Sequence, residues 1–262
     1  MVVRRRAVGR HLRSGALALV LIASAWCAGI TTVDAEVPPA TARPADPAAD
    51  AGSQAGERAE PAGCPDAPTI VTRLQARYDT TRAFRADFRQ QTTIAAVGTS
   101  EEARGRVAFK KPGKMRWEFE APDRQSIVSD GTTLWIYQPA DRQVLKAAFA
   151  AAFVSTTPVS FLTGMGRITE DFRPEADPRG CRGERLYVRL VARAQQDVGS
   201  LTLAVDRTTF DIVEAAVTDP LGNVTTLVFA NQERNVEIPD GEFRFEVPPG
   251  IDVITAPSGA PG

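Results

Sequence analysis

Histidine is almost absent from this sequence of 262 residues. The only one is His11, near the N-terminus, so the chain beyond it carries no imidazole. This absence excludes Ser-His and Cys-His catalysis and most transition-metal sites. Ser126, Ser129 and Ser155 have no base that could activate them. We therefore expect a protein that is not an enzyme and that holds no metal and no cofactor.

A long hydrophobic run is missing too. The most apolar stretch, residues 15–25 (GALALVLIASA), is shorter than the about 20 residues of a membrane-spanning helix. It follows the arginines of residues 4–13 and precedes Val33-Asp34-Ala35, which is the order of a secretory signal peptide. We expect residues 1–35 to be removed by cleavage after Ala35. An uncleaved anchor is the alternative.

Cysteine is scarce, and its three positions pose separate questions. Cys27 would be acylated in a lipoprotein signal, but that cysteine normally follows a small residue and here it follows Trp26. Cys64 and Cys181 are the remaining pair. In an oxidising compartment so sparse a pair is more often bonded than free, so we expect a disulfide between them. Two unrelated thiols are the alternative.

The region after the expected signal has the composition of a linker. Residues 36–62 are mainly Ala, Pro, Gly and charged residues, with Val37 as the only large apolar one, which predicts a flexible segment. One folded domain at residues 63–256 and a disordered tail at 257–262 should follow. Without residues 1–35 the chain has 26 basic and 31 acidic residues, a net charge of −5. No basic block remains, so we expect no nucleic-acid partner.

The domain begins with a helical pattern. Asp66 is suited to an N-cap, Pro68 to the first turn, and apolar residues follow at spacings of three and four: Ile70, Val71, Leu74 and Tyr78. We expect this helix to end near Thr80.

The apolar period then changes to two, as in half-buried strands. The alternating positions are Phe84, Ala86, Phe88; Val107, Phe109; Met115, Trp117, Phe119; Leu186, Val188, Leu190; Leu201, Leu203, Val205; and Phe243, Phe245. Pro112-Gly113, Asp130-Gly131 and Pro220 to Asn223 read as turns between strands. Residues 147–165 break the pattern and predict one or two short helices. Residues 173–185 read as a loop that carries Cys181.

These patterns predict a mainly β (α+β) fold. About nine to eleven antiparallel strands form one sheet with one dry face. A sheet of this size should curl into an incomplete barrel, and with no second sheet its dry face must be covered by a lid of short helices. A cavity between sheet and lid would be a natural ligand site.

Several stretches together resemble the LolA family of lipoprotein carriers. They occur in the family's order: residues 83–91 (AFRADFRQQ), 105–120 (GRVAFKKPGKMRWEFE), 126–139 (SIVSDGTTLWIYQP), 157–162 (TPVSFL) and 243–250 (FRFEVPPG). The second and third stretches are the specific ones. The resemblance implies a half-barrel with a helical lid. It also implies a monomeric periplasmic protein whose cargo is acylated lipoproteins, taken from an inner-membrane ABC transporter and passed to an outer-membrane receptor.

The resemblance also assigns roles to residues. Lys111 stands where the family has an Arg that bonds lid carbonyls, and Lys lacks the planar fork of Arg. We expect a weaker latch, although a solvated strand-end charge is the alternative. The expected acyl-chain cavity is lined by Phe84, Phe88, Met115, Trp117, Phe119, Val159, Phe161 and Leu162. Their alternative is an ordinary core. Other functions left open are an outer-membrane receptor, which needs lipidation at Cys27, and an envelope sensor.

Overall fold

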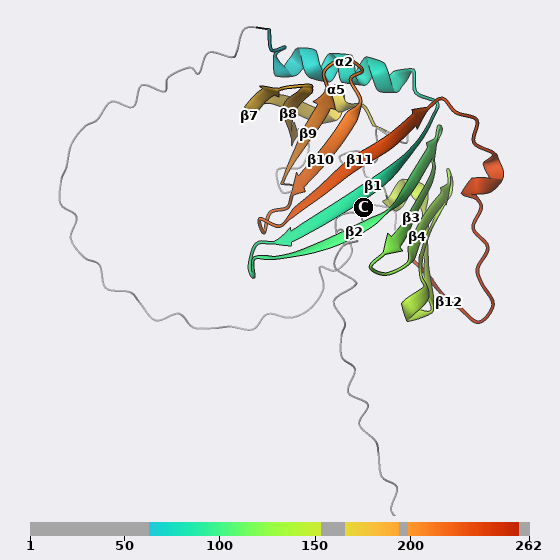
Figure 1. The fold of residues 1–262 in the computed structure, drawn as a ribbon. Coiled ribbons are helices and arrows are strands. Elements are labelled where there is room, and N and C mark those ends of the chain that lie inside the picture. Colours follow the sequence, from blue (N-terminus) through green and yellow to red (C-terminus); the bar gives the residue numbers. More distant parts are fainter. Residues whose placement is uncertain (1–62, 153–165, 194–198, 257–262) are drawn as a thin grey trace, which may run out of the picture.

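One sheet dominates the chain. The computed structural model describes residues 63–152, 166–193 and 199–256 (Figure 1). The strands are β1 (Ala83–Ile94), β2 (Thr99–Lys110), β3 (Lys114–Ala121), β4 (Gln125–Asp130), β5 (Thr133–Gln138), β6 (Gln143–Ala148), β7 (Phe172–Arg182), β8 (Arg185–Ala192), β9 (Ser200–Asp206), β10 (Ile212–Thr218), β11 (Val224–Arg234) and β12 (Asp252–Thr255). Helical segments are α2 (Ala67–Asp79), α3 (Phe149–Ala152) and α5 (Ile168–Asp171), with 3-10 turns η2 (Pro139–Asp141) and η3 (Asp240–Phe243).

The sheet is a nearly continuous meander whose two halves join in the middle. Its order is β12-β6-β5-β4-β3-β2-β1-β11-β10-β9-β8-β7, twelve strands against the nine to eleven expected. Neighbours are antiparallel except β12, which pairs in parallel with the edge strand β6. The long β1 pairs with β2 on one side and β11 on the other, which brings the two halves of the domain together. The mainly β class and the antiparallel sheet are confirmed.

The predicted N-terminal helix is confirmed as α2. The Asp66 side chain caps it by accepting a hydrogen bond from the Thr69 amide at 2.8 Å. Its apolar stripe, from Ile70 to Tyr78, is buried against β7, β8 and α5. Gln75, also buried, accepts a hydrogen bond from the Ile168 amide at 2.8 Å and so fixes the start of α5.

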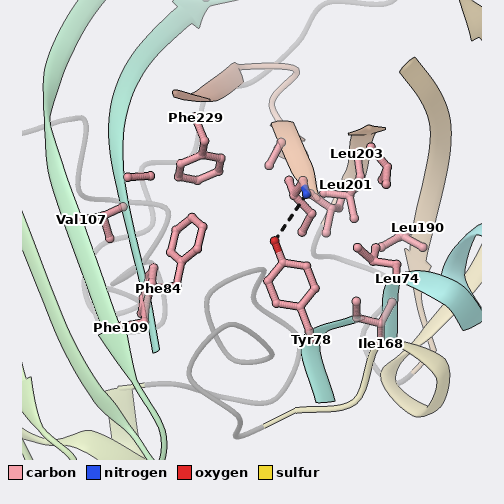
Figure 2. Packing of buried hydrophobic residues seen from close by; sticks show 14 of the residues in the cluster. Leu74, Tyr78, Phe84, Val107, Phe109, Ile168, Leu190, Leu201, Leu203 and Phe229 are labelled. Carbon is pink, nitrogen blue, oxygen red and sulfur yellow. Dashed lines mark hydrogen bonds between the residues drawn. The ribbon is translucent and has the colours of Figure 1, made fainter. Parts of the chain in front are cut away.

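The two faces of the sheet differ. On β1, Phe84, Ala86 and Phe88 are buried on one face, here called the inner face, while Arg85 and Asp87 are partly exposed on the other. The inner face belongs to one large apolar cluster that includes residues of both halves of the sheet and of α2. Figure 2 shows Phe84, Phe109 and Phe229 on one side of this cluster and Leu190, Leu201 and Leu203 on the other, with Tyr78 between them.

The outer face is crossed by residues 235–250, here called the strap. Two strap residues, Ile238 and Phe243, are buried against Ala83 and Ala108 of the sheet, and Phe243 is fully buried. Asp240 of the strap forms ion pairs of 2.7 Å with both Lys110 and Lys114. The strap then leads to β12 at the sheet edge (Figure 1).

Two predictions of local structure were wrong. Residues 243–246 are not a strand, because Phe243 ends the turn η3 and Phe245 packs on Trp135 and Tyr137 of the outer face. Residues 173–185 are not a loop, because residues 172–182 form β7. This edge strand pairs with β8 through its backbone, with a register shift between Ala176 and Cys181. Its Pro, Gly and charged side chains therefore do not have to alternate.

The two domain cysteines are joined. A disulfide links Cys64 to Cys181, with the Cα atoms 5.8 Å apart and a sequence separation of 117. It connects the segment just before α2 to β7. The helix is thus held to the edge of the sheet at its N-terminal side.

Candidate functional site

The inner face concentrates aromatic side chains where β1, β2, β3 and β11 lie side by side. Phe88 contacts Trp117 and Phe119, with ring centroids 4.8 Å and 5.0 Å apart. Phe84 lies 6.1 Å from Phe109 and 6.3 Å from Phe229 by the same measure. All but the tilted Phe84–Phe109 pair are edge-to-face, an arrangement that is favourable beyond the area it buries. Together these rings form one continuous surface, here called the aromatic wall, made of Phe84, Phe88, Phe109, Trp117, Phe119 and Phe229.

The close contact between the Phe88 and Phe119 rings depends on Gly105, which lies between them on β2. It pairs with Phe88 on one neighbouring strand and with Phe119 on the other. A side chain here would separate the two rings. A Cβ atom would also collide with the Glu118 carbonyl oxygen, because the β2–β3 register shifts at this point. Only glycine fits this backbone approach.

The structure brings together most residues of the expected cavity lining. Phe84, Phe88, Met115 and Trp117 are at most 3% exposed in the large cluster, and Phe119 is partly buried against it. Val159, Phe161 and Leu162 lie outside the described residues. Phe109 and Phe229 also belong to this surface but were not predicted as site residues, although both continue the alternating pattern of their strands.

Within the described residues, the buried polar side chains are Gln, Thr and Ser, and none carries a charge. Three of them continue the inner face beyond the aromatic wall. Gln90 donates to Thr92 at 3.4 Å, and the Thr92 and Thr225 hydroxyls are 3.2 Å apart. The inner face of β1 thus changes from aromatic to polar after Phe88. Such a surface matches an amphiphile.

Lys111 lies just beyond the end of β2 and contacts the helix. Its ammonium group donates a hydrogen bond to the Tyr78 carbonyl oxygen, in the last turn of α2. Burial lowers the pKa of Lys111, and the nearby Asp79 carboxylate opposes this shift. A cation at this position is favoured by the carbonyls that a helix leaves unpaired at its C-terminus.

The same end of α2 is held by a second set of contacts. Arg77 pairs with Asp211 at 3.0 Å, and Asp211 also pairs with Arg234. The Tyr78 hydroxyl accepts a hydrogen bond of 3.4 Å from the Ile212 amide (Figure 2). Burial raises the pKa of Tyr78 to about 12, so this phenol is neutral at physiological pH.

A polar pocket of about 400 Å³ lies on the outer face. It is lined by charged side chains, including Arg85, Asp87, Arg116 and the strap residue Glu242. It is therefore unsuited to hydrocarbon and is separate from the aromatic wall. Within residues 63–152, 166–193 and 199–256, no three His, Cys, Asp or Glu residues are placed to hold a metal ion. In the same ranges no helix is long and apolar enough to cross a membrane.

These features define a class: a mainly β protein whose single sheet presents an aromatic, uncharged inner face partly covered by helices. Comparison with known proteins makes the identification specific. The family model for the outer membrane lipoprotein carrier protein LolA matches residues 79–246. The chain belongs to the LolA family, a family of carriers rather than enzymes, which confirms the resemblance.

Two relatives identified by sequence agree with this assignment. An outer-membrane lipoprotein carrier protein of Chromobacterium violaceum is 34% identical over 194 residues, covering 73% of this chain and 90% of that protein. One from Methylobacillus flagellatus is 30% identical over 184 residues, with coverages of 70% and 88%. Among solved structures, a LolA superfamily protein from Nitrosomonas europaea is similar at 15% identity and a TM-score of 0.39, covering 69% of this chain and 98% of that one.

Proposed function

We propose that this protein is a periplasmic carrier that binds the acyl chains of lipoproteins at its inner face. It takes them from an inner-membrane ABC transporter and delivers them to an outer-membrane receptor. Residues 1–35 act as its export signal. Family membership supports the cargo, because the relatives named above are outer-membrane lipoprotein carrier proteins. The observation that carries the proposal is the aromatic wall, which is large, uncharged and lined from both halves of the sheet.

The proposal includes a shape for the binding site. The sheet curls into an incomplete barrel around its inner face, and the helical segments form a lid over it. In support, residues of β1 to β5 and of β8 to β11 belong to one cluster, although these groups lie in opposite halves of the strand order. The helices α2 and α5 add Leu74, Tyr78 and Ile168 to the same cluster.

Release of the cargo limits how tightly the site can hold it. Burial of acyl chains is worth about 0.8 kcal/mol per methylene. Two or three long chains would therefore approach the practical ceiling of about 18–21 kcal/mol for non-covalent binding. In this carrier the cargo displaces contacts within the apolar cluster that the sheet and the helices share. Net affinity is the difference between the two sets of contacts, which keeps binding reversible.

Lys111 acts as the latch of the lid. Its bond to the Tyr78 carbonyl joins the end of β2 to the last turn of α2. A single ammonium can be released more easily than a planar guanidinium that bonds several carbonyls. The lid of this protein therefore opens at a lower free-energy cost than one held by Arg.

Native mass spectrometry tests the function directly. The protein without residues 1–35 is incubated with a triacylated lipoprotein and, separately, with the same lipoprotein lacking its acyl chains. We expect a one-to-one complex with the acylated form only. Equal binding to both forms, or to neither, would refute carriage of acyl chains and favour an envelope sensor.

A further inference from the structure

The aromatic wall contains one polar group that has no partner. The indole nitrogen Nε1 of Trp117 is buried and, among the described residues, meets no hydrogen-bond acceptor. The residue as a whole is 3% exposed. Buried Trp N–H groups usually find an acceptor, and leaving one without a partner is unfavourable. An unpaired donor at the centre of a binding surface points to an acceptor on the ligand.

The surroundings of Trp117 restrict what that acceptor can be. Its ring lies 4.8 Å from Phe88, 5.9 Å from Phe109 and 6.4 Å from Phe119 and Phe229, measured between centroids. These rings accommodate hydrocarbon and supply no acceptor of their own. A carboxylate would be disfavoured, because the buried side chains of the described residues include no cation to pair with it. A neutral carbonyl on an apolar chain meets both conditions.

The register of the strands gives such a ligand a direction. Trp117 pairs with Val107, which pairs with Ala86, so these side chains form one row across the inner face. Further along β1 the face continues through Phe88 to Gln90 and Thr92, where it becomes polar. Trp117 therefore lies on the aromatic side of the boundary between the apolar and the polar part of the face.

We propose that Trp117 donates a hydrogen bond from Nε1 to the ester carbonyl of a bound acyl chain. The hydrocarbon lies among the rings near Phe84 and Phe109, and the glycerol end of the lipid faces Gln90, Thr92 and Thr225. The site thus selects acyl esters over alkyl chains of the same length. This inference rests on the proposed function and identifies the chemical group that the carrier recognises.

The test uses two diacyl lipopeptides that share one peptide and one chain length. One carries ester-linked chains and the other carries ether-linked chains, which lack the carbonyl. Dissociation constants are measured by calorimetry for the wild type and for Trp117→Phe, which keeps an aromatic ring but loses the N–H. Trp135→Phe is the matched control, because Trp135 packs on Phe245 of the strap on the outer face.

We expect the wild type and Trp135→Phe to bind the ester about three- to tenfold more tightly than the ether, the range for one net hydrogen bond. Trp117→Phe should bind both lipopeptides equally. Equal binding of ester and ether by the wild type would overturn the ester proposal while leaving carriage of acyl chains intact. Failure of the wild type to bind either lipopeptide would overturn both proposals.

A second measurement needs no variant at position 117. Beyond residue 35 the only tryptophans are Trp117 and Trp135, so indole-¹⁵N labelling gives two N–H signals, and Trp135→Phe assigns them. The Trp117 proton should shift downfield with the ester lipopeptide and not with the ether. Equal shifts with both lipopeptides would overturn the proposal.

Discussion

Substitution of Lys111 by Met should tighten the binding of acylated cargo. In the structure the ammonium group of Lys111 bonds the Tyr78 carbonyl and holds the end of α2 against the sheet. A hydrogen bond from a charged group contributes about 1.5–3 kcal/mol. Burial, which lowers the pKa of Lys111, offsets part of this. A net contribution of about 1 kcal/mol is a factor of about five in the closed-to-open equilibrium.

The assay is the dissociation constant for a diacyl lipopeptide. Where the open form is a minor population, the apparent affinity is proportional to that population. The affinity of Lys111→Met should therefore rise about fivefold, while Lys111→Arg should bind the lipopeptide less tightly than the wild type. Faster release of the lipopeptide from Lys111→Met, or an unchanged dissociation constant, would refute the latch.

Lys110→Met is the matched control. Lys110 is the neighbouring residue, but its ammonium group bonds the Ile238 carbonyl and Asp240 of the strap, both at 2.7 Å. Its loss should lower the free energy of unfolding by about 1 kcal/mol and leave the lipopeptide affinity unchanged. Comparison of the two variants separates opening of the lid from general destabilisation.

Three further predictions concern stability. Gly105→Ala should lower the free energy of unfolding in urea by about 1–3 kcal/mol, because its Cβ would meet the Glu118 backbone; Gly241→Ala, which has nothing within 4 Å, should cost nothing. Hydrogen bonds from Lys110 and Lys114 lower the pKa of Asp240 from 3.8 to about 2. The stability that this carboxylate contributes is present above about pH 4 and lost as the pH falls toward 2, so Asp240→Asn should flatten that part of the pH profile of Tm. Removing the disulfide with Cys181→Ala should cost up to about 4–5 kcal/mol, because the bond closes a loop of 117 residues; an unchanged urea midpoint would contradict this.

Local rules predicted the parts of the fold in which side chains determine structure. The cap at Asp66 and the apolar stripe of α2 predicted the helix within a residue. Alternation predicted the inner face of β1 and β3, since one face is buried there and the other is wet. The turns at Asp130-Gly131 and Pro220 to Asn223 connect the antiparallel pairs β4–β5 and β10–β11 as predicted.

The same rules failed at the edge strand β7 and at the strap, for two different reasons. β7 is an edge strand, and only its β8 side has to pair, so Pro174 and Gly180 are tolerated. Phe243 and Phe245 alternate like strand residues, but they anchor the strap to the outer face and belong to no strand. An alternating apolar pattern predicts which side chains are buried, but it does not predict whether they lie on a strand or in a loop that packs on the sheet.

The site could be predicted only in part for a related reason. The aromatic residues of β1 and β3 follow from their period, but the contact of Phe229 with Trp117 depends on β11 pairing with β1, more than a hundred residues apart in sequence. The unpaired N–H of Trp117 cannot be inferred from any pattern, because it depends on what its neighbours lack. Both the pairing of β11 with β1 and the lack of an acceptor for the Trp117 N–H are properties of the folded sheet.

The outer face of the sheet has its own set of stabilising contacts, distinct from the proposed binding surface on the inner face. The strap, with Phe243 and the Asp240 ion pairs, fastens β1 to β4 from the outer face. In the proposed carrier, acyl chains replace contacts on the inner face while the outer contacts keep the strands in register.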